Sequence, residues 1–139
     1  MQKIILITAL ILGTIATSIA QEKYTVTVEF SGMQSDNGKL YVALYDSEDQ
    51  FLKKGIQREI VEINDKKAIV IFKNVVSGVY AVSSFHDVNN NQKMDTRIFG
   101  IPKEPVGISN NAKGFMGPPK FEDAKFEVTK NTTLQIKVN

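Results

Sequence analysis

The sequence predicts an all-β domain, an antiparallel β-sandwich of about seven strands with one long ordered loop. Three observations predict it. Apolar and polar residues alternate after Gln21, turn motifs separate the alternating segments, and no helix of ten residues is indicated. A length of 139 residues fits a single domain whose core needs no covalent cross-link.

The expected strands are short and closely spaced. Residues 24–30 alternate apolar and polar, Asp36-Asn37-Gly38 supplies a tight turn, and residues 40–45 alternate again, so these two strands are expected to form a hairpin or meander. Ser47 and Gln50 resemble a capping box and predict one or two helical turns crossing an end of the sheet. Further strands are expected at residues 57–63, 68–73, 78–86, 124–129 and 132–138.

The segment 78–86 differs from the other expected strands, because neither of its faces is strongly polar. One face carries Val79, Ala81 and Phe85, and the opposite face carries Tyr80 and Val82. A strand that is apolar on both sides is typical of the middle of a sheet. We therefore expect this strand to be central.

A long segment separates the strand ending at His86 from the one starting near Ala124, although connections in compact domains usually span about four to six residues. It holds all four prolines and four of the nine glycines, so its backbone angles are constrained. Apolar side chains are expected to anchor it to the domain. They are Ile98, Phe99, Ile101, Val106, Ile108, Phe115 and Phe121.

Residues 1–20 are expected to be a cleaved signal peptide. Lys3 precedes an apolar stretch that is shorter than the ~20 residues of a membrane span, and Ser18 and Ala20 suit a signal peptidase. The domain is then residues 21–139, exported to the periplasm or secreted, with no membrane span after cleavage. A retained membrane anchor is the competing interpretation.

Composition excludes several classes of function. With no cysteine, the chain has no disulfides, no thiolate metal site and no cysteine nucleophile. Seventeen basic against fifteen acidic residues leave no positive field for nucleic acid, so no nucleic-acid partner is expected. Function must therefore come from a local group of residues.

The clearest such group opens the long loop. Oxygen-bearing side chains at relative positions 1, 3, 5 and 9 have the spacing by which a tightly wound loop directs ligands at calcium, with a backbone carbonyl at position 7. Two carboxylates about 4 Å apart repel by ~4 kcal/mol at an effective dielectric constant of ~20, and a divalent cation reverses that repulsion. The predicted ligands are Asp87, Asn89, Asn91, the carbonyl of Lys93, and Asp95.

The loop is not an EF-hand. Position 6 is Gln92 where an EF-hand needs glycine, and position 12 is Ile98 where it needs a bidentate glutamate. Further ligands must come from water or from Glu104, Glu122 or Asp123. Two certain carboxylates predict the weak affinity of extracellular calcium modules, with a Kd on the order of 0.1–1 mM. The alternative is an Asn-rich turn whose side chains bond their own backbone.

Several of these motifs together resemble the DUF2141 family of exported bacterial domains, which have no assigned activity. The resemblance implies a sandwich similar to prealbumin-like, immunoglobulin-like and B-repeat modules, some of which bind calcium. Family members commonly have glycine where this chain has Asn90 and Gln92. The resemblance rests on Gly78-Val79-Tyr80-Ala81-Val82, His86-Asp87, the loop to Asp95, Phe99-Gly100-Ile101-Pro102-Lys103-Glu104, Gly107-Ile108-Ser109-Asn110-Asn111, and Pro118-Pro119-Lys120-Phe121-Glu122-Asp123-Ala124.

The sequence therefore predicts an exported binding or structural module with a low-affinity calcium site, whose partner is an unidentified protein or glycan. The alternative is a secreted hydrolase of transthyretin-like architecture that uses His86, the only histidine. Ser84 and His86 share a strand face, but residues i and i+2 lie ~6–7 Å apart, too far for a serine–histidine hydrogen bond. No catalytic residue is predicted.

Overall fold

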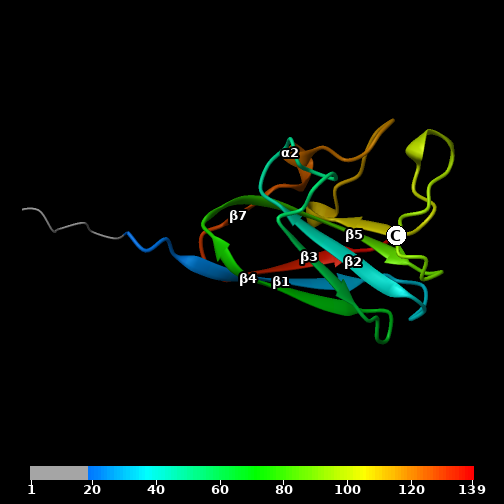
Figure 1. The fold of residues 1–139 in the computed structure, drawn as a ribbon, viewed down its shortest axis with the longest axis horizontal. Helices are drawn as coiled ribbons and strands as arrows, with labels where there is room; N and C mark the ends of the chain where they lie inside the picture. Colours follow the sequence, from blue (N-terminus) through cyan, green and yellow to red (C-terminus); the bar gives the residue numbers. More distant parts are fainter. Residues whose placement is uncertain (1–18) are drawn as a thin grey trace, which may run out of the picture.

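The computed structural model of the protein describes residues 19–139, so almost all of the predicted signal peptide lies outside the described residues. Eight strands and three short helical segments make up the described chain (Figure 1). The strands are β1 (Lys23–Ser31), β2 (Lys39–Tyr45), β3 (Gln57–Val61), β4 (Ala68–Val76), β5 (Gly78–Asp87), β6 (Val106–Ile108), β7 (Phe126–Val128) and β8 (Thr132–Lys137). The helical segments are η1 (Ile98–Gly100), η2 (Ser109–Asn111) and α2 (Phe121–Ala124).

The strands form two sheets, which confirms the predicted all-β sandwich. One sheet has the order β4-β1-β8, and the other has the order β3-β2-β5-β6 with β7 paired to the beginning of β5. All pairs are antiparallel except β1 with β8, which are parallel. The short strand β6 lies inside the segment that was expected to be one long loop.

The expected pairing of the first two strands is wrong, because β1 and β2 belong to different sheets. Their connection is longer than a hairpin turn, and its Met33 is buried in the core between the sheets. Each strand has one apolar face. Two such strands can pair within one sheet, or they can belong to two sheets whose apolar faces pack against each other. Alternation alone does not distinguish these arrangements.

The core lies between the two sheets and consists of the apolar side chains that alternate along the strands. Residues i, i+2 and i+4 of a strand point to the same face, so each strand contributes every second residue. Removing these side chains from water supplies most of the stability of such a domain. The main contributors are Val26, Val28, Phe30, Leu40, Val42, Leu44, Val70, Phe72, Val82, Val128 and Ile136.

Strand β5 is central, as its two apolar faces predicted. It pairs with β2 on one side and with β6 and β7 on the other. Its Tyr80 and Val82 point into the core, whereas Ala81 joins a smaller apolar cluster on the outer face of the sheet. We call this group the satellite cluster; its buried members are Tyr45, Phe51, Ala81, Ile108 and Ala124.

The helical turns expected after Ser47 are a run of turns with one bond of the α-helical i to i−4 type, from the Lys54 amide to the Gln50 carbonyl at 2.9 Å. Phe51 from this run packs edge-on against Tyr45 and Phe121, with ring centroids 5.3 and 5.7 Å away. The turns therefore cover one end of the outer face, where the sequence placed them. No helix in residues 19–139 is long and apolar enough to cross a membrane.

Only part of the long segment is anchored by apolar contacts. Ile108 and Phe121 pack in the satellite cluster, and Val106 is half-buried on β6. Ile98, Phe99, Ile101 and Phe115 are instead exposed, Phe99 at 97% and Phe115 at 91%. The expectation that these four side chains anchor the loop is therefore wrong, and polar bonds at its base hold the loop instead.

Candidate functional site

The site begins at Asp87, the last residue of β5, which is completely buried. One carboxylate oxygen accepts the amide N–H of Asn91 at 3.1 Å, and the other accepts that of Gln92 at 2.8 Å. These two bonds pull the chain into a tight winding directly after the strand. Asn90 and Gln92 both adopt the left-handed conformation that the winding needs, with φ of 56° and 68°.

The two asparagines of the loop each bond in two directions. The side-chain oxygen of Asn89 accepts the Asn91 amide at 3.2 Å, and that of Asn91 accepts the Lys93 amide at 3.1 Å. Their side-chain nitrogens both donate to the Asp95 carboxylate, Asn89 at 2.7 Å and Asn91 at 2.9 and 3.0 Å. The structure thus brings Asn89, Asn91 and Asp95 together, with amide hydrogens facing the carboxylate.

The Asp95 carboxylate is stabilised in its charged form. The bonds from Asn89 and Asn91 lower the pKa of its carboxyl group, and the nearby cations Lys93 and Lys103 lower it further. Lys93 reaches the loop through its backbone amide, and its side chain is exposed. The base of the loop closes where the Lys103 amide donates to the Asp95 carbonyl at 2.8 Å.

Glu104 adds a third carboxylate to the base of the loop. Its side chain is only 8% exposed, and its Oε2 accepts the Asp95 amide at 3.2 Å. Its Oε1 is buried and has no hydrogen-bond partner among the described residues. Burial raises the pKa of the Glu104 carboxyl group. The bond from the Asp95 amide opposes this shift, whereas the negative charges of Asp87 and Asp95 and a hydrogen bond from the protonated carboxyl to Asp87 add to it.

Of the three additional ligands that the sequence offered, only Glu104 lies at the loop. Glu122 and Asp123 belong to α2, which packs beside Ala81, six residues before Asp87 on β5 and so ~20 Å away along the strand. Glu122 pairs with Lys125 at 2.7 Å. Within residues 19–139, no three His, Asp or Glu side chains are grouped closely enough to hold a metal ion as they stand.

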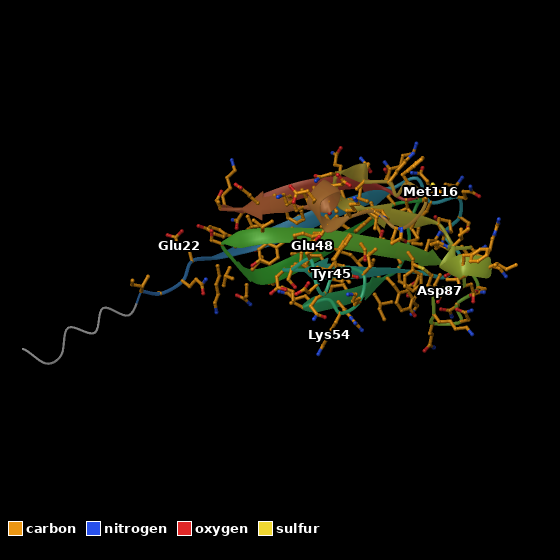
Figure 2. The ribbon with its side chains drawn as sticks, turned by 90° about the horizontal axis from the view of Figure 1, so that it is seen from above. Glu22, Tyr45, Glu48, Lys54, Asp87 and Met116 are labelled. Atoms are coloured by element: carbon orange, nitrogen blue, oxygen red, sulfur yellow. The ribbon has the colours of Figure 1, made fainter. Side chains whose placement is uncertain are left out.

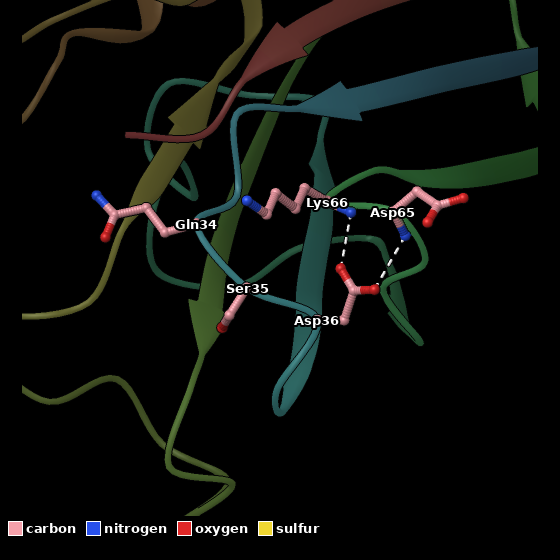
Figure 3. A pocket seen from close by; sticks show the side chains of 5 residues that line it. All are labelled: Gln34, Ser35, Asp36, Asp65 and Lys66. Carbon is pink, nitrogen blue, oxygen red and sulfur yellow. Dashed lines mark hydrogen bonds between the residues drawn. The ribbon is translucent and has the colours of Figure 1, made fainter.

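Asp36 is a further acidic residue, and its role is structural. Its two carboxylate oxygens accept the amides of Asp65 and Lys66 at 3.0 and 2.7 Å (Figure 3). Asp65 and Lys66 both have positive φ, so their amides point the same way and one carboxylate satisfies both. This contact ties the connection after β1 to the turn before β4 and lines the shallow hollow between them.

The single histidine lies in the core, away from solvent. His86 is completely buried, and its Nε2 lies 2.6 Å from the carbonyl oxygen of Asn37. The Ser84 hydroxyl donates to the Gly107 carbonyl at 3.0 Å. A general base must reach the proton it removes. Nε2 of this imidazole faces a backbone carbonyl, and Nδ1 is buried without a hydrogen-bond partner among the described residues. The hydrolase that uses His86 stays an alternative prediction.

Sequence comparison agrees with the resemblance found in the motifs. The family model described as an uncharacterized protein conserved in bacteria, DUF2141, matches residues 28–136, from β1 to β8. The match includes the whole loop from Asp87 to Glu104. No curated protein and no solved structure matches the chain. The chain therefore belongs to the DUF2141 family.

Proposed function

We propose that the protein is an exported β-sandwich module, with a binding or structural role toward an unidentified protein or glycan, that binds calcium weakly in the 87–95 loop. The ligands are those that the spacing predicts, Asp87, Asn89, Asn91, the Lys93 carbonyl and Asp95. Glu104 joins them from the base of the loop.

One observation carries the proposal: Glu104 is buried beside the Asp87 and Asp95 carboxylates, and no described residue donates a hydrogen bond to its Oε1. A buried charge is costly unless it is paired or bound to a metal. Asp87 is buried too, so two of the three negative charges are removed from water. A divalent cation at this position compensates all three.

Calcium fits this site better than other cations because every candidate ligand is an oxygen. Calcium accepts six to eight oxygen ligands in flexible arrangements, whereas magnesium demands near-octahedral geometry and gives up its waters reluctantly. In the structure the side-chain nitrogens of Asn89 and Asn91 donate hydrogen bonds to Asp95. Binding requires these two side chains to turn so that their oxygens face the ion.

Thermal unfolding tests the proposal. At a calcium concentration ten times the Kd, binding adds about 1.4 kcal/mol, which raises the Tm of a domain of this size by about 5 °C over that in chelator. Glu104→Gln keeps the shape of the side chain, removes its charge, and is expected to abolish most of the shift. Glu122→Gln is the matched control, because Glu122 lies on α2. An equal shift in both variants contradicts the role of Glu104, and no shift in the wild type contradicts the calcium site.

A further inference from the structure

The outer face of the larger sheet is apolar where such faces are usually polar. Antiparallel sheets commonly bury one face and solvate the other. Here one row across the four strands reads Ile60, Tyr41, Phe85 and Val106. Tyr41 and Phe85 stack with ring centroids 4.8 Å apart and an interplanar angle of 13°. The two rings form a flat aromatic floor.

Loop residues surround this aromatic floor, and together they enclose a groove of about 1030 Å³. Residues 92–94 and 99–102 line one side, residues 111–114 and 117–119 line another, and Tyr45 and Ile108 of the satellite cluster lie at the end of the floor. Two labelled residues near these lining segments, Asp87 and Met116, lie toward the same end of the molecule, and Glu22 lies toward the other end (Figure 2). Small-molecule sites usually enclose about 300–1,000 Å³, so the groove is large enough for one.

The groove also contains polar groups that can orient a ligand. The Tyr45 and Ser83 hydroxyls lie 2.9 Å apart. Four cationic side chains line the groove, and none forms an ion pair within residues 19–139. Glu59 is the one acidic side chain among the lining residues. The cations are Arg58, Lys93, Lys113 and Lys137.

We propose that the groove binds a monomeric amphiphile with an apolar chain and an anionic head, of which a medium-chain fatty acid is the simplest example. The chain lies on the Tyr41–Phe85 floor, where burial of each CH₂ group is favourable by about 0.8 kcal/mol. The carboxylate of the ligand pairs with cations that line the groove, which we call the rim; they are Arg58, Lys93, Lys113 and Lys137. A small ligand fits the concave shape better than a bilayer, whose flat surface meets the exposed Phe115 and Met116 but not the floor.

The groove proposal does not rest on the calcium site. Its floor comes from strands β2, β3, β5 and β6, and only Gln92, Lys93 and Met94 of its lining belong to the 87–95 loop. It is therefore tested in chelator, which also prevents fatty acids from precipitating as calcium salts. A negative result then leaves the calcium proposal standing.

The test is isothermal titration calorimetry of the described domain with dodecanoate below its micelle concentration. One molecule is expected to bind per chain, and dodecyltrimethylammonium, with the same chain and the opposite charge, is expected to bind at least tenfold more weakly. Arg58→Glu on the exposed strand β3 should weaken dodecanoate binding about three- to tenfold. Lys130→Glu makes the same charge change outside the groove lining and should leave the affinity unchanged.

A second variant changes the aromatic floor of the groove and leaves the cations of the rim in place. Phe85→Ala, at a half-buried position on β5, should reduce the affinity at least tenfold for both amphiphiles. If that variant does not fold, Lys137→Glu repeats the charge reversal at another cation that lines the groove. Equal affinity for both head charges, or no effect of any rim variant, overturns the proposal. The proposal is also overturned if the protein sediments with phosphatidylglycerol vesicles but does not bind monomeric dodecanoate. That result assigns the exposed Phe115 and Met116 to contact with a bilayer.

Discussion

The sandwich core and the loop from Asp87 to Glu104 are ordered by opposite means. In the core, apolar side chains from both sheets exclude water, and no specific partner is needed for any one of them. In the loop, Ile98, Phe99 and Ile101 point outward, and order comes from hydrogen bonds to two carboxylates. A long segment can therefore be shaped by hydrogen bonds to a few carboxylates, without an apolar core of its own.

The largest expected effect lies in the core. Phe72→Ala, at a completely buried position, should destabilise the domain by about 3–5 kcal/mol, because it removes apolar burial and leaves a cavity. Chemical denaturation measures the loss. The same loss should appear with and without calcium. If calcium restored the stability lost in Phe72→Ala, core packing and the loop would not be independent, which would contradict the comparison.

Asp87→Ala should have the next largest effect, about 2–3 kcal/mol. It deprives the Asn91 and Gln92 amides of a buried acceptor and releases the winding of the loop. Asp49→Ala, at an exposed position, is the control and should change stability by less than about 0.5 kcal/mol. Hydrogen exchange should accelerate at Asn91 and Gln92 but not in β1. Unchanged exchange there would mean that the carboxylate does not hold the loop.

A third prediction concerns pH in chelator. The pKa of Glu104 is raised in the fold, so its contribution to stability is fully present below the usual pKa of glutamate and is lost as pH rises through the folded-state value. Asp87 and Asp95 face it with negative charge, and Lys93 and Lys103 lie near Asp95.

Glu104→Gln mimics the protonated form and isolates this contribution. Its Tm should match that of the wild type at pH 4 and exceed it increasingly toward pH 7, because only the wild type gains a buried charge. At pH 7, saturating calcium should raise the Tm of the wild type to at least that of Glu104→Gln. Parallel pH profiles of the two proteins would show that the Glu104 carboxyl titrates normally.

The smallest expected effect is at Gln92, which has a φ of 68°. A left-handed conformation costs a non-glycine residue about 1–2 kcal/mol, and the greater flexibility of glycine in the unfolded chain offsets part of the gain. Gln92→Gly should therefore stabilise the domain by about 0.5–1 kcal/mol. Gln92→Ala, which removes the side chain but keeps the strain, should not. Equal stability of the two variants would exclude backbone strain at this position.

Sequence patterns predicted the part of the molecule that follows a simple period. Alternation identified the strands and the central place of β5, because side chains on a strand point to opposite faces in turn. The same alternation misassigned β1 and β2 to one sheet, since it carries no information about which strands pair. Strand β6, with three residues, is too short to show a period.

The candidate site was predicted only in part for a similar reason. The spacing from Asp87 to Asp95 was visible because neighbouring residues of one loop carry it. Glu104 was one of three possible additional ligands, and only the closing of the loop at Lys103 distinguishes it from Glu122 and Asp123. The groove was not predicted, because Tyr41 and Phe85 meet only through strand pairing, although the two apolar faces of β5 were a signal for it.

A crystal structure of the domain soaked in 10 mM calcium tests the central claim most directly. The expected result is one ion within about 2.3–2.6 Å of oxygens from Asp87, Asp95 and Glu104, with the Asn89 and Asn91 amides turned so that their oxygens face it. The contradicting result is a loop without an ion in which the side-chain nitrogens of Asn89 and Asn91 still donate to Asp95.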